Sequence, residues 1–441
     1  MATYNALSNA IGVAPRERTA VTLAFLCSFV LMGSYYILRP VRDTVATEFG
    51  AGQLQNLFTA TFIGTFIASA IYASLASRVR LTRLLPGVFW FWMTNVVLFE
   101  MLFRAMPHSH WLGATYFVWF SVVNLFMISV FWSLMVDVFS PAQATRLFAV
   151  IASGGALGSI AGPLLTRLLV KSLGLSGMLL LSAAGFALVI LLVHLLMREK
   201  ARLRESGGEA QQSTLDHSLS GNAWDAFGQL FKSRYALSQA AFILLMTWVS
   251  TVAYFCQTDL IARTYAAINS RAQALADIDL VVNICTAIIL IFGLGRLVHK
   301  FGVTAGLILN PLLMIVAFVG IAFSPTLFTI QLTQIVRRVA QYAIARPSRE
   351  ICFTVVEQGG RYKSKNVIDT VVYRLGDVTS AWVQGGLSAL GYGLNGAVAV
   401  GVGASILWGA VATTLGRRYE ERLRHHVALR TERTARTLTL L

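Results

Sequence analysis

Arginine and aspartate side chains occur inside two adjacent apolar segments of this sequence, where they could bind an anion. Arg337 and Arg338 lie within the first segment, and Asp369, Arg374 and Asp377 lie within the second. An ionisable side chain inside a membrane-spanning segment is costly unless it lines a polar cavity or has a partner. The group therefore predicts a solute pathway. The alternative is a set of buried ion pairs that only hold helices together.

The spacing in the first segment separates the two arginines. Arg337 and Gln341 are i, i+4 neighbours on a helix, as are Arg338 and Tyr342. Successive residues of an α-helix point about 100° apart, so only one of the two arginines can face a central cavity. We expect one arginine, together with Gln341, to bind the solute and the other to pair with a carboxylate.

Two acidic residues share one face of the second segment. Asp369, Tyr373 and Asp377 follow one another at four-residue spacing, whereas Arg374 points elsewhere and is expected to contact the solute. Asp369 and Asp377 either carry a coupling proton or neutralise neighbouring arginines. The spacing alone is compatible with both roles.

A second group of basic residues lies at the end of the first apolar segment, in the run SYYILRPVRDTV. Tyr35, Arg39 and Arg42 lie there beside Asp43. Guanidinium groups bind phosphates and carboxylates through paired hydrogen bonds. The first three residues therefore predict a cationic mouth that draws an anion inward, and Asp43 is expected to act as an ion-pair or coupling partner. The alternative is that the arginines extend to the lipid headgroups.

Three polar residues on the fourth apolar segment and the turn after it are further candidates. Asn124 lies in mid-segment, where an amide either contacts the solute or bonds to a neighbouring helix. Asp137 and Arg146 flank the turn to the fifth segment and predict a structural ion pair or a gate.

Glycines recur at four-residue spacing in the fifth apolar segment. Gly154, Gly158 and Gly162 fall on one helical face, and such a face lets two helices approach closely. A phosphate-binding loop is excluded, because no Gly-Lys-Ser/Thr follows and no strand precedes the run.

The composition indicates a membrane protein. Of 441 residues, 56% are hydrophobic and 13% are charged, which is too apolar for a soluble domain. The net charge of +16 is concentrated in short loops and in the tail, a pattern of membrane topology rather than of nucleic-acid binding. The four cysteines have no metal or redox spacing, so neither a metal nor another cofactor is expected.

Twelve apolar windows of about twenty residues predict an all-α membrane protein. They cover residues 19–38, 54–76, 84–105, 112–138, 147–173, 177–197, 236–258, 276–298, 303–323, 326–345, 367–390 and 395–416. Two six-helix halves, 19–197 and 236–416, flank a polar linker at 198–235, with an N-terminal segment at 1–18 and a basic tail at 417–441. This is the layout of the major facilitator architecture, in which the solute site lies between the halves.

Most lysines and arginines outside the apolar windows fall on one set of alternating loops. Basic loops stay on the cytoplasmic side. We therefore expect both termini in the cytoplasm and the chain in the inner membrane of a bacterium. The expected partners are a small anionic solute and the lipid bilayer, without nucleic acid, and the expected state is a monomer.

Three motifs resemble those of the ATP/ADP translocase family of nucleotide transporters. The runs ARPSRE, RYKSKNVIDTVVYRLG and WVQGGL are similar to one region of that family, ILRPVRD to a second, and FWSLMVDVFSPAQATRLF to a third. The resemblance covers essentially the whole chain in the same order. It implies antiport of anionic nucleotides by alternating access, with Arg42 standing where the family has a lysine and Arg374 on its arginine.

The chain also departs from that family. Pro40 replaces an acidic residue, Phe120 stands near the place of a glutamate, and a second glutamate is missing around residues 255–257. These differences leave a transporter as the expected function and separate it from ATP/ADP exchange itself. The alternatives are a proton-coupled carrier for another metabolite, peptide or siderophore and, outside transport, a membrane-embedded lipid-processing protein. An enzyme is not expected, because no nucleophile and base occur together.

Overall fold

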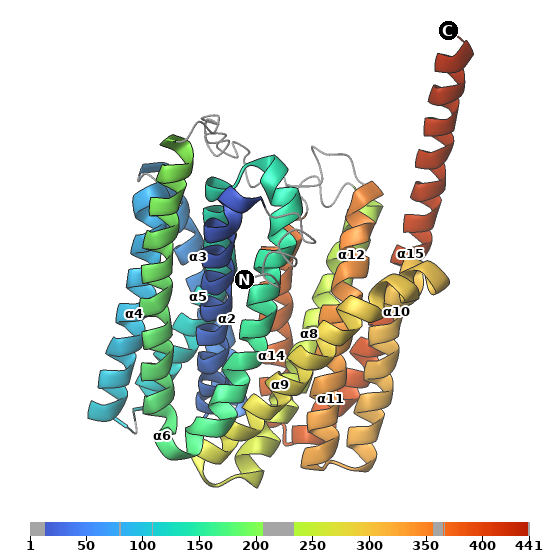
Figure 1. Ribbon diagram of the computed structural model, residues 1–441. Helices are drawn as coiled ribbons and strands as arrows, with labels where there is room; N and C mark the ends of the chain where they lie inside the picture. The colour runs from blue at the N-terminus through green and yellow to red at the C-terminus, as the bar shows by residue number, and fades with distance from the viewer. Residues whose placement is uncertain are drawn as a thin grey trace. The chain divides into compact units, whose positions relative to one another are not determined.

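The structure is a computed structural model (Figure 1), which describes residues 14–78, 81–107, 109–205, 233–355, 365 and 367–439. Within these ranges all the regular secondary structure is helical, as expected, and short turns connect the helices. Most of the predicted linker, the start of the N-terminal segment and the inner loop at 356–364 lie outside the described residues.

Five long helices form the first part of the described chain. They are α2 (Arg18–Ala46), α3 (Ala51–Arg78), α4 (Leu81–Ala105), α5 (His110–Val138) and α6 (Pro141–Glu205), preceded by the short turn η1 (Pro15–Glu17). The second part of the described chain contains seven α-helices: α8 (Arg234–Thr264), α9 (Ile268–Phe292), α10 (Leu294–Phe323), α11 (Leu327–Ala340), α12 (Arg346–Cys352), α14 (Tyr373–Ala389) and α15 (Gly393–Thr439). Two π-helical turns, η3 (Gln341–Ala345) and η5 (Ile368–Val372), interrupt the charged segments.

Glycines with positive φ divide two of the long helices. In α6, Gly174 has φ 69° and ψ −179°, a conformation that glycine adopts without a steric penalty. The chain turns back there (Figure 1), so that α6 contains both predicted spans 147–173 and 177–197. Gly302, with φ 79°, likewise separates the first turns of α10 from the predicted span 303–323.

The helices are consistent with twelve membrane spans. Among the described residues, nine helices are long and apolar enough to cross a membrane, and one of them, at Gln143–Arg202, accounts for two predicted spans. The predicted spans 326–345 and 367–390, which carry the arginines and aspartates, fall on α11 to η3 and on η5 to α14, outside those nine. The predicted basic tail does not form a separate element, because α15 continues to Thr439 through residues with high helix propensity.

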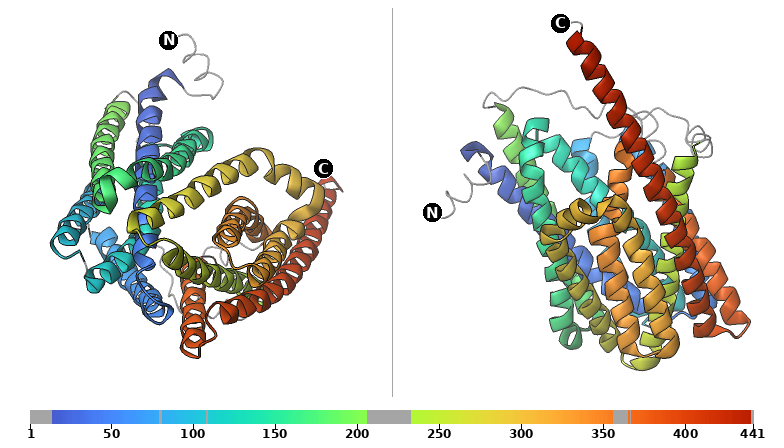
Figure 2. Two further views of the ribbon diagram at one scale, coloured as in Figure 1. Left: turned by 90° about the horizontal axis from the view of Figure 1, so that it is seen from below. Right: turned by 90° about the vertical axis from the view of Figure 1, so that its right-hand side faces the viewer.

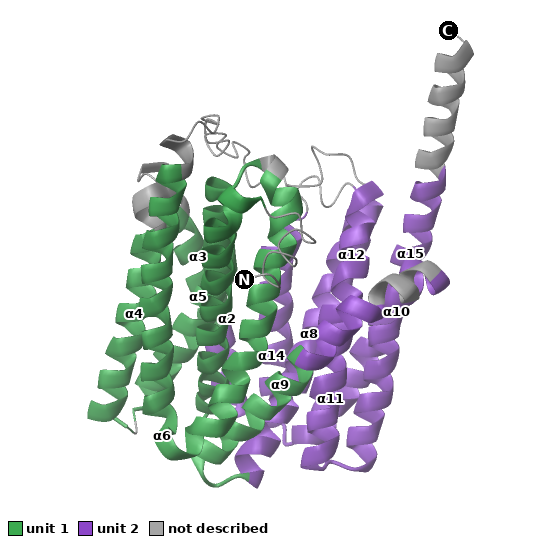
Figure 3. Cartoon of the chain, in the orientation of Figure 1, with its two compact units in different colours: residues 1–49, 59–218, 265–283 green, residues 50–58, 219–264, 284–441 purple. Residues whose placement is uncertain are grey.

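The chain divides into two compact units (Figure 3). Unit 1 contains residues Met1–Phe49, Thr59–Ser218 and Tyr265–Asn283, and unit 2 contains Gly50–Phe58, Leu219–Thr264 and Ile284–Leu441. The first turns of α9 therefore belong to unit 1, although the rest of that helix belongs to unit 2. Within unit 2, the helix formed by α11, η3 and α12 lies beside α10, and α11 also lies beside α8 (Figure 2).

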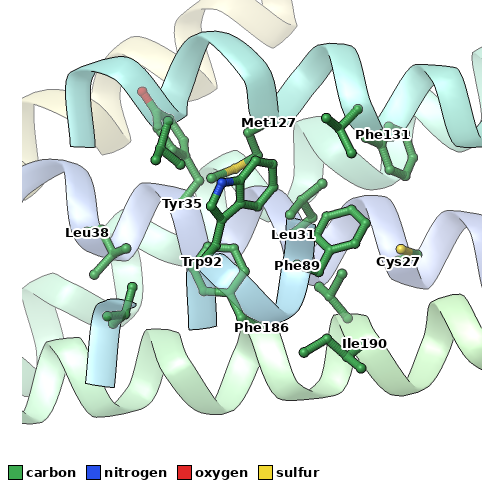
Figure 4. Close-up of a cluster of buried hydrophobic side chains, with 14 of the residues drawn as sticks. Cys27, Leu31, Tyr35, Leu38, Phe89, Trp92, Met127, Phe131, Phe186 and Ile190 are labelled. Atoms are coloured by element: carbon green, nitrogen blue, oxygen red, sulfur yellow. The ribbon is translucent and has the colours of Figure 1, made fainter. Parts of the chain in front are cut away.

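Large apolar side chains from four helices fill the core of unit 1. Figure 4 shows Leu31 and Tyr35 of α2 among side chains of α4, α5 and α6, including Trp92, Met127 and Phe186. All five are buried. This core fixes the end of α2 on which the predicted basic group lies.

The three spaced glycines pack α6 directly against α2, which confirms the close approach predicted from their spacing. A Cβ atom on Gly158 would lie 2.1 Å from the Phe29 carbonyl oxygen, and one on Gly162 would lie 2.5 Å from that of Gly33. On Gly154 it would lie 2.4 Å from the Phe25 carbonyl oxygen. These distances are shorter than any ordinary contact, so a side chain at these positions forces the helix backbones apart.

Gly158→Ala is therefore expected to destabilise the protein. Overpacking of this kind costs about 2 kcal/mol, which corresponds to a fall in melting temperature of roughly 4–8 °C in a unit of this size. The control is Gly403→Ala in α15, where an added Cβ meets nothing within 4 Å and the higher helix propensity of alanine should leave the melting temperature unchanged or raised. Equal melting temperatures for the two variants would show that α2 and α6 can separate without loss.

Candidate functional site

Arg337 lies at the centre of a buried polar group in unit 2. Its Nε and Nη2 donate to Gln334 Oε1 at 3.2 and 2.8 Å, and its Nη1 donates to Ser250 Oγ and to Gln341 Oε1, each at 2.9 Å. Gln334 in turn donates from Nε2 to the Ala253 carbonyl oxygen at 2.8 Å. The plane of the guanidinium is thus held between α8, α11 and η3 by neutral groups.

Arg338 is buried as deeply as Arg337, with 4% and 7% of their surfaces exposed. Because successive helical residues point in different directions, Arg338 does not share the position of Arg337. The predicted i, i+4 neighbour of Arg337, Gln341, is indeed its hydrogen-bond partner.

Arg374 and Asp377 form a second polar group in the same unit. Arg374 Nη1 lies 3.6 Å from Asp377 Oδ2, and Thr251 of α8 donates to Asp377 Oδ1 at 3.1 Å. Arg374 therefore does not point away from this acid, because residues three apart on a helix are also neighbours. Both charged side chains are largely buried.

Asp369 belongs to a different cluster from Asp377. Its carboxylate accepts a hydrogen bond from Arg349 Nη1 at 2.6 Å, at the start of the π-helical turn η5. A π turn takes more residues than an α turn, so the four-residue spacing from Asp369 to Tyr373 does not put both on one line. The shared face that the sequence predicts is broken at this point.

The cluster around Arg349 was not predicted from the sequence. Arg349 is buried and also pairs with Glu350 at 2.7 Å, and Lys365 pairs with the same glutamate. Both cations lie over the ring of Phe353, at 5.9 and 5.5 Å from its centroid. The signal available in the sequence was the Arg-Glu pair of ARPSRE.

The pKa of Glu350 makes this cluster sensitive to acid. Burial raises the pKa of the Glu350 carboxyl, but hydrogen bonds from Lys365 and Arg349 lower it by a larger amount. The pKa therefore lies below its ordinary value of 4.5. A carboxyl whose pKa is lower in the folded than in the unfolded chain stabilises the fold above the unfolded value. That stabilisation is lost as the pH falls through the folded value.

The melting temperature of wild type should therefore exceed that of Glu350→Gln by a constant amount at neutral pH. The difference should shrink below about pH 4.5 and disappear at lower pH, which a thermal melt at each pH would measure. Glu421→Gln, at an exposed position of α15, is the control and should match wild type throughout. A difference that does not change with pH would contradict an ionised Glu350.

In unit 1, Arg42 lies over an aromatic surface of α5. Its guanidinium carbon is 5.3 Å from the Phe117 ring centroid and 5.7 Å from that of Phe120. Arg42 also donates from Nε to Asp43 Oδ1 at 2.9 Å and from Nη1 to Ser121 Oγ at 3.4 Å. The rings orient the guanidinium by cation–π contacts, and its charge is paired with the Asp43 carboxylate.

Phe120 links the predicted residues of this group. Tyr35 stacks on it with a centroid separation of 5.3 Å and an interplanar angle of 10°. Asn124 lies one helical turn farther along α5 and is half-buried. Phe120 stands near the place where the resemblance puts a glutamate, so an aromatic ring here faces the arginine that matches a lysine of the translocase family.

Arg39 is oriented by an acid that was not among the predicted residues. Its guanidinium carbon lies 5.6 Å from the ring centroid of Tyr36, and its Nε lies 3.7 Å from Asp279 Oδ2. Asp279 is on α9 and only 2% exposed. An aspartate within an apolar segment was the available signal.

Asp137 and Arg146 each have a partner from a distant part of the sequence. Asp137 pairs with Lys200 near the end of α6. Arg146 lies 3.1 Å from Glu17 Oε1, and that oxygen also accepts a hydrogen bond from Gln143 at 2.9 Å. These pairs join the ends of α5, α6 and η1 within unit 1.

Comparison with known proteins identifies the family. The model of the Major Facilitator Superfamily matches residues 24–338. The chain is 22% identical to ADP,ATP carrier protein 2 of Chlamydia pneumoniae, over 92% of this chain and 89% of that protein. It is 25% identical to ADP,ATP carrier protein 2 of Chlamydia trachomatis, over 70% and 66% respectively. These relatives confirm the resemblance to nucleotide carriers drawn from the three motifs.

Solved structures show the same fold. The nucleoside transporter NupG matches with a TM-score of 0.62 at 17% identity, over 93% of this chain and 99% of that chain. A bacterial homologue of the iron transporter ferroportin, in its inward-facing state, matches with a TM-score of 0.63 at 13% identity, over 91% and 98%. These structures confirm the expected all-α fold, and the family match with the carrier relatives confirms the expectation of a transporter rather than an enzyme. This chain, a multi-pass membrane protein and secondary transporter, belongs to the Major Facilitator Superfamily.

Proposed function

We propose that this transporter moves an organic anion, such as a nucleotide or another phosphorylated metabolite, by alternating access along a path lined by arginines. The observation that carries the proposal is the setting of Arg337, whose guanidinium is buried and held in one orientation by Gln334, Gln341 and Ser250. The similarity to two ADP,ATP carriers supports the same class of solute.

The chemistry of this group suits phosphate. A guanidinium presents parallel N–H donors that match two oxygens of a phosphate. Two adjacent buried arginines, Arg337 and Arg338, give a positive potential that favours an anion over a neutral solute. In unit 1, we propose the same role for Arg42, with Tyr35, Arg39 and Asn124 as further contacts of the solute.

A proton-coupled carrier is the second candidate, favoured by the position of Asp377. This carboxylate is 8% exposed, accepts a hydrogen bond from Thr251 and lies 3.6 Å from Arg374. A buried acid so close to a cation could exchange a proton when a solute displaces the cation. Asp369, paired with Arg349 in a separate cluster, is the less favoured proton carrier.

The cellular setting is part of the proposal. The distribution of lysine and arginine along the sequence supports cytoplasmic termini, and the bacterial relatives support the inner membrane of a bacterium. We propose a monomer in which the halves 19–197 and 236–416 move about the linker at 198–235.

Transport by purified protein in proteoliposomes separates the two candidates. Uptake of labelled ATP that requires ADP inside the vesicle would support nucleotide antiport. Uptake of a solute only under an imposed pH gradient would support proton coupling instead. Vesicles that take up neither nucleotides nor sugar phosphates under either condition would contradict the proposed class of solute.

A further inference from the structure

The first turns of α9 are held within unit 1 by one ion pair in which both side chains are buried, by further ion pairs with a more exposed partner, and by hydrogen bonds. In the buried pair, 11% of the Arg39 side chain and 2% of the Asp279 side chain are exposed. In the pair of Arg167 with Asp277, at 3.3 Å, these fractions are 51% and 41%. Exposed pairs contribute little, whereas a buried charge that loses its partner is strongly unfavourable. Asp279 is the most deeply buried acid among the ion pairs of this segment, so its charge depends most on keeping its partner.

The same segment also has an ion pair between Arg271 and Glu48, whose side chains are 13% and 47% exposed, and hydrogen bonds to backbone and hydroxyl groups. Asn283 donates from Nδ2 to the Ser159 carbonyl oxygen at 2.5 Å, and Arg271 donates from Nη1 to Thr47 Oγ1 at 3.1 Å. Both partners belong to unit 1. From Ile284 onward, the same helix belongs to unit 2, so the segment 268–283 is the part of α9 whose attachment to unit 1 can change.

Arg39 pairs with Asp279 of α9 and is also one of the proposed contacts of the solute. Tyr35, Arg39 and Arg42 are spaced i, i+4 and i+7, which places them along one side of α2. The separation of 3.7 Å between Arg39 Nε and Asp279 Oδ2 exceeds the length of a hydrogen bond. A phosphate group that made paired hydrogen bonds to Arg39 would therefore bind it better than this carboxylate does.

We propose that Asp279 occupies Arg39 in the unloaded carrier and that an anionic solute displaces it, which frees residues 268–283 of α9 from unit 1. Binding of the solute is thereby coupled to a conformational change in a helix that continues into unit 2. Asp279 is a positioning residue in this scheme, because it acts through Arg39. The inference depends on the proposed function, since it requires an anion at Arg39.

Hydrogen–deuterium exchange of the segment 268–283 tests the inference in the purified full chain. Without any solute, Asp279→Asn should accelerate exchange of this segment by roughly tenfold relative to wild type, because its buried ionic contact is lost. In wild type, ATP or inorganic pyrophosphate should produce the same acceleration. In Asp279→Asn neither anion should accelerate it further.

Asp277→Asn is the matched control. It removes the same charge two residues earlier on α9, from an exposed pair that does not involve Arg39, and should exchange and respond to anions as wild type does. If Asp279→Asn does not fold, Arg39→Gln removes the other partner and should accelerate exchange with no response to either anion.

Three outcomes decide the inference. Equal exchange in Asp279→Asn and wild type would overturn it, and so would an acceleration in that variant with no effect of either anion on wild type. A response of wild type to pyrophosphate but not to ATP would support displacement of Asp279 by phosphate while contradicting a nucleotide as the solute. The exchange measured without solute is independent of the proposed function.

Discussion

Arg337→Ala is expected to reduce anion transport by at least about 100-fold, the equivalent of roughly 3 kcal/mol from the loss of charge-assisted hydrogen bonds. The structure provides the reason, because Gln334, Gln341 and Ser250 hold this guanidinium in one orientation inside unit 2. Initial rates of uptake into proteoliposomes, together with the rise in melting temperature on addition of ATP, would measure the loss.

Two variants make this result specific. Arg337→Lys keeps the charge but lacks the planar set of donors, so it should recover only part of the activity. Arg263→Ala removes a charge from an exposed pair with Asp259 on α8 and should transport as wild type does. Wild-type rates in Arg337→Ala would rule out a solute contact at this residue.

Arg374→Ala is expected to abolish transport and also to destabilise the fold by about 3 kcal/mol, because it removes the neighbouring cation from the buried carboxylate of Asp377. Asp377→Ala should have a similar effect on stability, since it removes the neighbouring anion from Arg374. The double variant removes both charges and should regain most of the lost stability. Thermal melts of wild type, the two single variants and the double variant would measure these differences in stability.

Transport by the double variant separates a solute contact from a structural pair. If Arg374 binds the solute, the double variant should be stable and inactive. If the pair only holds α14 in place, transport should return together with stability. The proposed function predicts the first result, and a stable, active double variant would contradict it.

Several features of the site followed from spacing along a single helix. The position of Gln341 beside Arg337 and the shared face of Gly154, Gly158 and Gly162 followed from the sequence, because neighbours on one helix are fixed by its geometry. The helix that packs on the glycines, α2, did not follow from it. The separation of Asp369 from Asp377 was not predicted. The π-helical turn η5 changes which residues lie above one another, and the four-residue spacing of the sequence is the same whether the turn is π or α.

The partners of the charged residues were the least predictable part of the site. Asp137 pairs with Lys200, Arg146 with Glu17 and Arg39 with Asp279. Each pair joins residues more than 60 positions apart in the sequence, so it depends on how the helices pack. The contacts of Phe120 could not be predicted from the sequence either, since only the folded chain brings Tyr35 and Arg42 to this ring.

The sequence by itself determined the class of the protein. Long apolar segments must satisfy their backbone hydrogen bonds internally in a lipid bilayer, which permits helices, and charges placed inside such segments indicate a solute path. Only the tertiary structure decided which charged residues pair with one another, including the pair of Arg39 with Asp279 of α9. The physical reason is that a buried charge without a partner is strongly unfavourable, so burial determines which pairs must form. Burial itself depends on how the helices pack and not on any one segment.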